Sequence, residues 1–223
     1  MKIKFALLAA AIFLISAFRS AGALTMEWGS EVFSDFADSY GNTLNSTYIF
    51  ELGAFTPGFV PDQSNVSLWL ENWLVFDRAS YSESNGYFSS TVQMGDDGRS
   101  DSPDQTPGTI SFAGLDAYIW VRNEDEPVPG TEWLLTRTAY WTFPVAESGC
   151  CGNEVPIQWS LSDLDSGDVP LWGSQGGVDG WGVQTDTDIH TLQTFTFLPE
   201  VSSAVLVCMA GVFSLLRRHR TTN

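Results

Sequence analysis

Three carboxylates in one short segment are the clearest candidate ligand-binding group in the sequence. Asp163, Asp165 and Asp168 lie within six consecutive residues, with Ser166 and Gly167 between them. Hard cations prefer several oxygen ligands on a flexible loop, so calcium is the one cofactor that the sequence suggests. The alternative is a solvated acidic loop, which is favoured because the glutamate that ends an EF-hand loop is missing. The same choice applies to a second acidic cluster, formed by Asp96, Asp97, Asp101 and Asp104.

Residues for catalysis are scarce. Of the two histidines, His219 belongs to the basic C-terminal end, which leaves His190 beside Asp188 as the one candidate base. The sequence has no phosphate-binding glycine loop, dinucleotide fingerprint, H-E-x-x-H helix or C-x-x-C pair. Carboxylate pairs are so abundant that chance pairs are certain, and they carry no specific sign of glycoside hydrolysis. We therefore predict no catalytic residue and no enzyme.

Adjacent cysteines could stiffen one loop. Cys150 and Cys151 lie between glycines, whereas Cys208 belongs to an apolar C-terminal run. In an oxidising compartment the adjacent pair could form a strained disulfide ring within the loop, or it could pair between molecules. Both alternatives stay open, and a catalytic thiol is not expected.

The N-terminal residues 1–23 have the pattern of a secretory signal peptide. Lys2 and Lys4 precede an apolar run over residues 5–18, and Ala21 and Ala23 form an A-x-A cleavage site. The secretion translocon and signal peptidase are the expected partners, and the mature chain would begin at Leu24. An uncleaved N-terminal anchor is the alternative, but the apolar run is short for a membrane span of about 20 residues.

The C-terminal residues 198–223 combine a short motif, an apolar run and a basic end. The motif Pro199, Glu200, Val201 precedes an apolar run over residues 204–216, which the basic residues Arg217, Arg218 and Arg220 follow. The apolar run partitions into lipid, and the arginines stay on the cytoplasmic side. Even from residue 201 the run has sixteen residues, fewer than the roughly 20 that a spanning helix needs. A run this short is better suited to holding the chain in the membrane temporarily. The alternative is a permanent membrane anchor.

This tail resembles the PEP-CTERM sorting signal of Gram-negative bacteria. Pro199, Glu200 and the arginine cluster match that signal, and Val201 occupies the place of its second proline. Leu198 and Pro199 also match the start of a sortase signal, but the threonine and glycine that sortase needs are replaced. The PEP-CTERM resemblance implies an exosortase-type membrane protease as a partner. It also implies transient residence in the inner membrane, then release to the cell surface or an exopolysaccharide matrix.

Residues 24–197 have the size of one domain and a strongly acidic composition. They contain four arginines, no lysine and 26 carboxylates, a formal net charge of −22. This charge repels nucleic acid and anionic lipid, so no nucleic-acid partner is expected. Nine tryptophans and fifteen phenylalanines in the chain exclude a disordered protein.

The hydrophobic patterns predict an all-β domain, a β-sandwich or jelly roll with one short helix. Short runs rich in β-branched and aromatic residues are separated by turn residues. The expected strands are 47–52, 87–92, 109–112, 117–122, 133–136, 139–143, 156–161 and 192–197. Residues 64–76 instead have apolar side chains at helical spacing, and Ser64 or Asn65 is the expected cap. This helix is expected to cover one open end of the sandwich.

These features predict an exported protein with a structural or adhesive role at the surface or in the extracellular matrix. The alternative is a calcium-assisted carbohydrate-binding module that uses exposed tryptophan or tyrosine beside the acidic loops. A hydrolase is a third class, and the sequence does not favour it.

Overall fold

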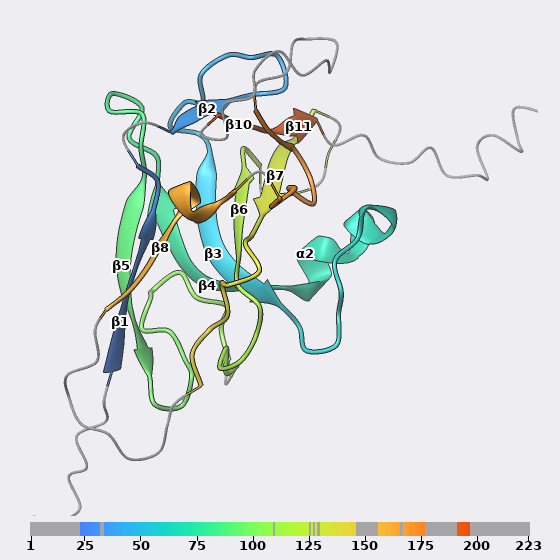
Figure 1. Ribbon diagram of the computed structural model, residues 1–223. Coiled ribbons are helices and arrows are strands. Elements are labelled where there is room, and N and C mark those ends of the chain that lie inside the picture. Colours follow the sequence, from blue (N-terminus) through green and yellow to red (C-terminus); the bar gives the residue numbers. More distant parts are fainter. Residues whose placement is uncertain are drawn as a thin grey trace, which may run out of the picture.

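The structure, a computed structural model, is built mostly from β-strands (Figure 1). It describes residues 23–31, 34–108, 110–124, 126, 128, 130–145, 156–165, 167–176 and 191–196. The strands are β1 (Ala23–Gly29), β2 (Asp35–Ala37), β3 (Ile49–Phe55), β4 (Trp73–Ser80), β5 (Ser89–Gly95), β6 (Tyr118–Arg122), β7 (Glu132–Thr136), β8 (Ile157–Ser160), β9 (Ser174–Gln175), β10 (Thr191–Gln193) and β11 (Phe195–Thr196). The helical segments are the 3-10 helices η1 (Gln63–Leu68) and η2 (Leu161–Asp163) and the single-turn α-helix α2 (Trp69–Asn72).

The strands form three sheets. An antiparallel five-stranded sheet has the order β11-β7-β6-β3-β4. A three-stranded sheet has the order β5-β1-β8, in which β1 runs antiparallel to β5 and parallel to β8. A third small sheet, β2-β10-β9, joins segments from both ends of the described chain.

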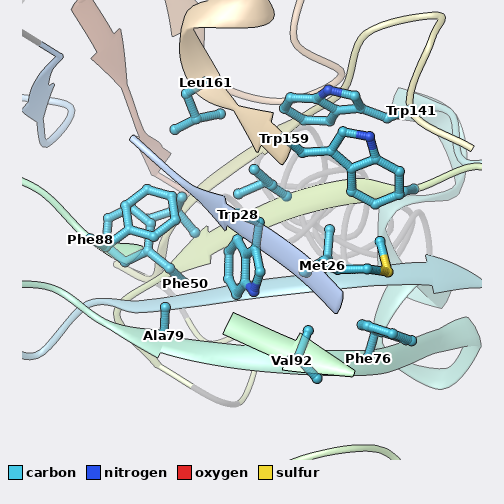
Figure 2. Close-up of a cluster of buried hydrophobic side chains, with 14 of the residues drawn as sticks. Met26, Trp28, Phe50, Phe76, Ala79, Phe88, Val92, Trp141, Trp159 and Leu161 are labelled. Carbon is cyan, nitrogen blue, oxygen red and sulfur yellow. The ribbon is translucent and has the colours of Figure 1, made fainter. Parts of the chain in front are cut away.

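The main hydrophobic core takes side chains from the five-stranded sheet and from β5-β1-β8. Phe50 and Phe76 come from β3 and β4, and Met26, Trp28 and Trp159 come from β1 and β8. Figure 2 shows these side chains gathered around β1. Strands with one face toward this core alternate, as in the buried Met26 and Trp28 with exposed Glu27 between them. The expected all-β architecture is confirmed at this level.

An irregularity between β3 and β4 lets two consecutive residues face the core. The pairing register shifts between Leu52 and Gly53, so the strands pair Leu52 with Asp77 but Gly53 with Val75. Phe76 packs in the core, and the neighbouring Asp77 accepts a hydrogen bond from Trp28 Nε1 at 2.7 Å. A β-bulge of this kind re-aims a side chain. It lets β4 contribute both apolar packing and a polar link to β1.

The other face of the five-stranded sheet is also buried. Segment η1–α2 and residues 171–172 pack over it, on the side away from β5-β1-β8 (Figure 1). The second core there consists mainly of aromatic side chains: Phe55, Trp69, Trp73, Tyr118, Trp120 and Trp133, with Val66 and Leu135. Because both faces are covered, β6 and β7 are buried at every position, including Arg122 and Glu132.

The predicted helix over residues 64–76 is wrong in its last four residues. The helical segment runs only from Gln63 to Asn72, and Trp73 begins β4. Asp62 is the N-cap, with a capping box to Asn65. A strand buried on both faces is apolar at nearly every position, so residues 73–76 fit a helical period as well as a strand.

Among the residues that the structure describes, no helix is long and apolar enough to cross a membrane.

Two predicted strands are also absent. Residues 110–112 and 139–143 lie in no strand, apart from an isolated bridge between Thr142 and Asp116. Phe112, Trp141 and Phe143 are buried in the main core, so their apolar character comes from packing of loops rather than from strand pairing. The patterns also do not predict β1, β2, β4 or β9; β1 begins at Ala23, inside the expected signal peptide.

Candidate functional site

The first acidic loop uses its carboxylates to hold its own backbone. Asp163 Oδ2 accepts hydrogen bonds from the backbone N–H of Ser160 and from Trp141 Nε1, at 2.9 and 3.2 Å. Asp165 Oδ1 accepts from the N–H of Gly167, and Asp168 Oδ2 accepts from the N–H of Asp165. These bonds turn the three side chains to different local partners. A calcium site here stays a prediction without support from this geometry.

The second acidic cluster lies beside a polar pocket of about 390 Å³. Asp97 Oδ2 forms a 3.2 Å ion pair with Arg99 Nε, and Asp101 Oδ1 accepts a hydrogen bond from the N–H of Gln93. Across the residues with described coordinates, no three acidic, histidine or cysteine side chains converge as a metal site requires. This pocket therefore offers hydrogen-bonding groups rather than a ready cation site.

Several sequence-predicted residues lie outside the described residues. They are the cleavage-site residue Ala21, the possible disulfide pair Cys150 and Cys151, the candidate base His190 with Asp188, the sorting motif Pro199, Glu200 and Val201, and the basic residues Arg217, Arg218 and Arg220. Ala23 is described: it is exposed at the start of β1 and pairs with Gly95. Cleavage after Ala23 would thus leave Leu24 as the first residue of that strand.

One carboxylate is fully buried behind the aromatic face of the five-stranded sheet. The Glu51 side chain has 0% exposure, and its Oε1 lies 2.6 Å from Arg78 Nη2 and 2.9 Å from Arg122 Nη2. Its Oε2 accepts a hydrogen bond from Trp73 Nε1 at 2.9 Å. The Arg122 guanidinium also lies 5.3 Å from the centre of the Trp120 ring. Buried charges persist only when paired and hydrogen-bonded, and Glu51 meets both conditions.

A second buried carboxylate ties β7 to the small sheet and β11. Glu132 accepts four hydrogen bonds: from the N–H and Oγ of Ser39, from Thr194 Oγ1 and from Thr196 Oγ1, at 2.5 to 3.0 Å. Burial, followed by the nearby Glu132 charge, raises the pKa of Tyr48 above its usual value. All the donors are neutral, so this cluster is suited to joining segments rather than to proton transfer.

A small pocket with an aromatic floor lies where β3 ends. It measures about 240 Å³ and is lined by residues 55–59 and 114–116 together with Tyr118; we call it the aromatic pocket. Phe55 meets Tyr118 edge to face, with ring centres 5.3 Å apart, and stacks on Phe59 at 5.3 Å. Trp73 packs against Phe55 from the second core at 5.2 Å. The floor is therefore held from below by the packed aromatic layer.

One wall of the aromatic pocket is a Pro-Gly turn. The N–H of Phe59 donates to the C=O of Thr56 at 2.9 Å, and Gly58 has a φ of 89°. Proline fixes the second position of such a turn, and glycine accepts the positive φ at the third. The local sequence Thr56-Pro57-Gly58-Phe59 thus brings the Phe59 ring back onto Phe55.

A second glycine turn, at residues 112–115, forms another wall. The N–H of Leu115 donates to the C=O of Phe112 at 2.9 Å, and Gly114 between them has a φ of 76°. Backbone hydrogen bonds in both directions then tie this turn to Phe143, through Gly114 and Leu115. Both walls are fixed by backbone contacts, so the pocket exists without a ligand to shape it.

Polar groups stand at the edge of this aromatic surface. Asp116 Oδ2 forms an ion pair with Arg137 Nη1, and the same nitrogen lies 3.3 Å from the Tyr118 hydroxyl. The Arg137 guanidinium also lies 5.2 Å from the centre of the Tyr118 ring. The Asp116 side chain is 53% exposed. A rigid aromatic floor with an oriented charged pair at its rim can bind a ring-shaped polar molecule.

Sequence reasoning did not find this pocket. It expected exposed tryptophan or tyrosine beside the acidic loops, but seven of the eight tryptophans among the described residues are buried. The strongly exposed tyrosines, Tyr40 and Tyr140, do not line the pocket. The Pro57-Gly58 pair between Phe55 and Phe59 was the available signal, because it predicts a turn that brings two rings together.

No family model, curated protein or solved structure matches this chain.

Proposed function

We propose that this chain is an exported protein that its C-terminal tail sorts to the cell surface or an extracellular matrix. Its β-sandwich domain, with two facing sheets, has a structural or adhesive role there. The observation that carries the proposal is the placement of positive charge. All lysines lie near the N-terminus, and Arg217, Arg218 and Arg220 follow the C-terminal apolar run.

This charge placement supports a temporary hold in the inner membrane. The apolar run enters lipid, and the arginine cluster stays on the cytoplasmic side, since charged groups cross hydrocarbon at high cost. Pro199 and Glu200 then stand at the outer face of the membrane, within reach of an exosortase-type protease. Cleavage there would release the acidic domain from its anchor.

The domain itself supports a role outside the cell. Two aromatic cores and buried carboxylates with several hydrogen bonds each make a tightly connected interior. Four arginines against 26 carboxylates in residues 24–197 keep such a domain soluble and repel other polyanions. These properties suit a durable surface protein.

Substitution of the motif glutamate tests the sorting step. The variant Glu200→Ala is expected to be exported normally but to stay in the inner membrane, because the protease loses its recognition group. Membrane fractionation and surface labelling in the native host measure this. Glu71→Ala, at an exposed glutamate of α2, is the matched control and should reach the surface. Unchanged surface delivery of Glu200→Ala would count against the tail as a sorting signal.

A second candidate function is carbohydrate binding. The observation that favours it is the aromatic pocket, which combines ring faces with a charged rim. The acidic loops carried the calcium-assisted form of this idea, but Asp165 and Asp168 bond to backbone N–H groups of their own loop, and Asp97 pairs with Arg99. Glycan binding lost on chelation would restore the calcium form.

A further inference from the structure

We propose that the aromatic pocket binds a single neutral pyranose ring of a saccharide, without a metal ion. The proposal names the site and the ligand class for the second candidate function and rests on that function. It does not depend on the sorting tail. Phe59 supplies the ring face, and Asp116, held by Arg137, supplies the hydrogen-bonding group.

The pocket offers an apolar surface of the right kind for a sugar ring. A pyranose has one or both faces lined by C–H groups, which pack against the negative face of an aromatic ring. Phe59 is half-buried with one side against Phe55, so the rest of its ring is accessible. Phe55 and Tyr118 are nearly buried and fix the floor. Rigid aromatic anchors bind at a low cost in conformational entropy.

The rim supplies a hydrogen-bond acceptor for hydroxyl groups. Arg137 holds Asp116 through Oδ2, and the Asp116 side chain is still 53% exposed, which leaves it accessible to a ligand. An aspartate oriented in this way can accept hydrogen bonds from sugar hydroxyls, and charge-assisted bonds of this type are the stronger ones. The ion pair also fixes the carboxylate before the ligand arrives, which reduces the ordering cost of binding.

Size and charge narrow the ligand to a neutral ring. The pocket volume of about 240 Å³ lies below the roughly 300–1,000 Å³ of sites for drug-sized ligands, so one ring fits better than an oligosaccharide. The formal charge of −22 over residues 24–197 repels uronic acids and phosphorylated or sulfated sugars. The single carboxylate in the pocket does not form a multi-oxygen calcium cage.

The test uses the full chain, purified in a detergent that lacks a sugar headgroup. Saturation-transfer difference NMR with the methyl pyranosides of glucose, galactose, mannose and glucuronic acid reports binding of each ring. We expect at least one neutral sugar to bind more tightly than the uronate, with an affinity that EDTA leaves unchanged. Phe59→Ala and Phe59→Leu should each weaken that affinity at least tenfold, because both remove the aromatic face. Asp116→Asn should weaken it several-fold.

Tyr40→Ala is the matched control, since it removes a 74% exposed aromatic side chain outside the pocket. Circular dichroism establishes that each variant is folded, and Phe59→Leu keeps apolar packing where alanine leaves a gap. Absence of binding by every neutral sugar would overturn the proposal. Binding unaffected by both Phe59 variants, binding lost with EDTA, or preference for the uronate would do so too. Surface localisation of Glu200→Ala, by contrast, would overturn only the sorting proposal.

Discussion

Replacement of Glu51 with glutamine is expected to lower the free energy of unfolding by about 3–5 kcal/mol. Glutamine keeps the shape but removes the negative charge that Arg78 and Arg122 share. The Arg78 side chain is 35% exposed and can turn to water, whereas the Arg122 side chain is 6% exposed and cannot. The expected loss therefore comes from removing the buried negative charge that the nearly buried Arg122 guanidinium contacts. Urea unfolding followed by circular dichroism measures it.

The exposed ion pair between Asp97 and Arg99 provides the control. These side chains are 59% and 43% exposed, and their nitrogen–oxygen distance is 3.2 Å, against 2.6 and 2.9 Å for the pairs of Glu51. Because water screens exposed pairs, Asp97→Asn should change the free energy of unfolding by about 1 kcal/mol at most. If the two substitutions changed the free energy of unfolding equally, the burial of Glu51 would not be what determines its contribution to stability.

Truncation of Trp120 to alanine should cost about 3–5 kcal/mol of stability. Its ring packs edge to face against Trp69, Trp73 and Trp133, at centre distances of 4.9 to 6.1 Å, so alanine opens a cavity in the middle of the second core. The site is fully buried on a central strand, where the surroundings cannot collapse easily. Thermal and urea unfolding measure this loss.

Phenylalanine substitutions separate the packing of these rings from their hydrogen bonds. Trp120 Nε1 is buried without a hydrogen-bond partner among the described residues, whereas Trp69 Nε1 donates to Asn65 Oδ1 at 2.7 Å. Removal of an unpaired donor relieves a desolvation penalty, and removal of a paired one loses a bond. Trp120→Phe should therefore destabilise the protein less than Trp69→Phe. The reverse order would contradict the assigned roles of the two indoles.

The strand periodicity predicted most of the five-stranded sheet. Residues 117–122 and 133–136 closely match β6 and β7, because dense β-branched and aromatic residues there leave little choice. The structure of residues 73–76 could not be predicted from their own pattern, because it depends on packing by other segments. The aromatic layer covers the outer face of the sheet, so residues 73–76 of β4 are apolar, and mostly buried, on both faces. Their apolar pattern therefore resembles that of a helix.

The polar sites were harder to predict for the same reason. Glu51 alternates with Phe50 and Leu52, which would place it in solvent on a sheet with one open face. Its burial follows from the tryptophans of distant segments, and its partners Arg78 and Arg122 are 27 and 71 residues away. The aromatic pocket likewise needs two turns that are remote in sequence. The local sequence indicates each turn, but it does not show that the two turns lie next to each other.

The central claim is that the N-terminal signal peptide and the C-terminal sorting tail are both removed from an exported domain. Mass spectrometry of the mature protein from its native host tests this most directly, because it reports both termini at once. We predict an N-terminus at Leu24 and a C-terminal cut that removes Arg217, Arg218 and Arg220. A protein recovered intact from Met1 to Asn223 in the cytosol would contradict the claim.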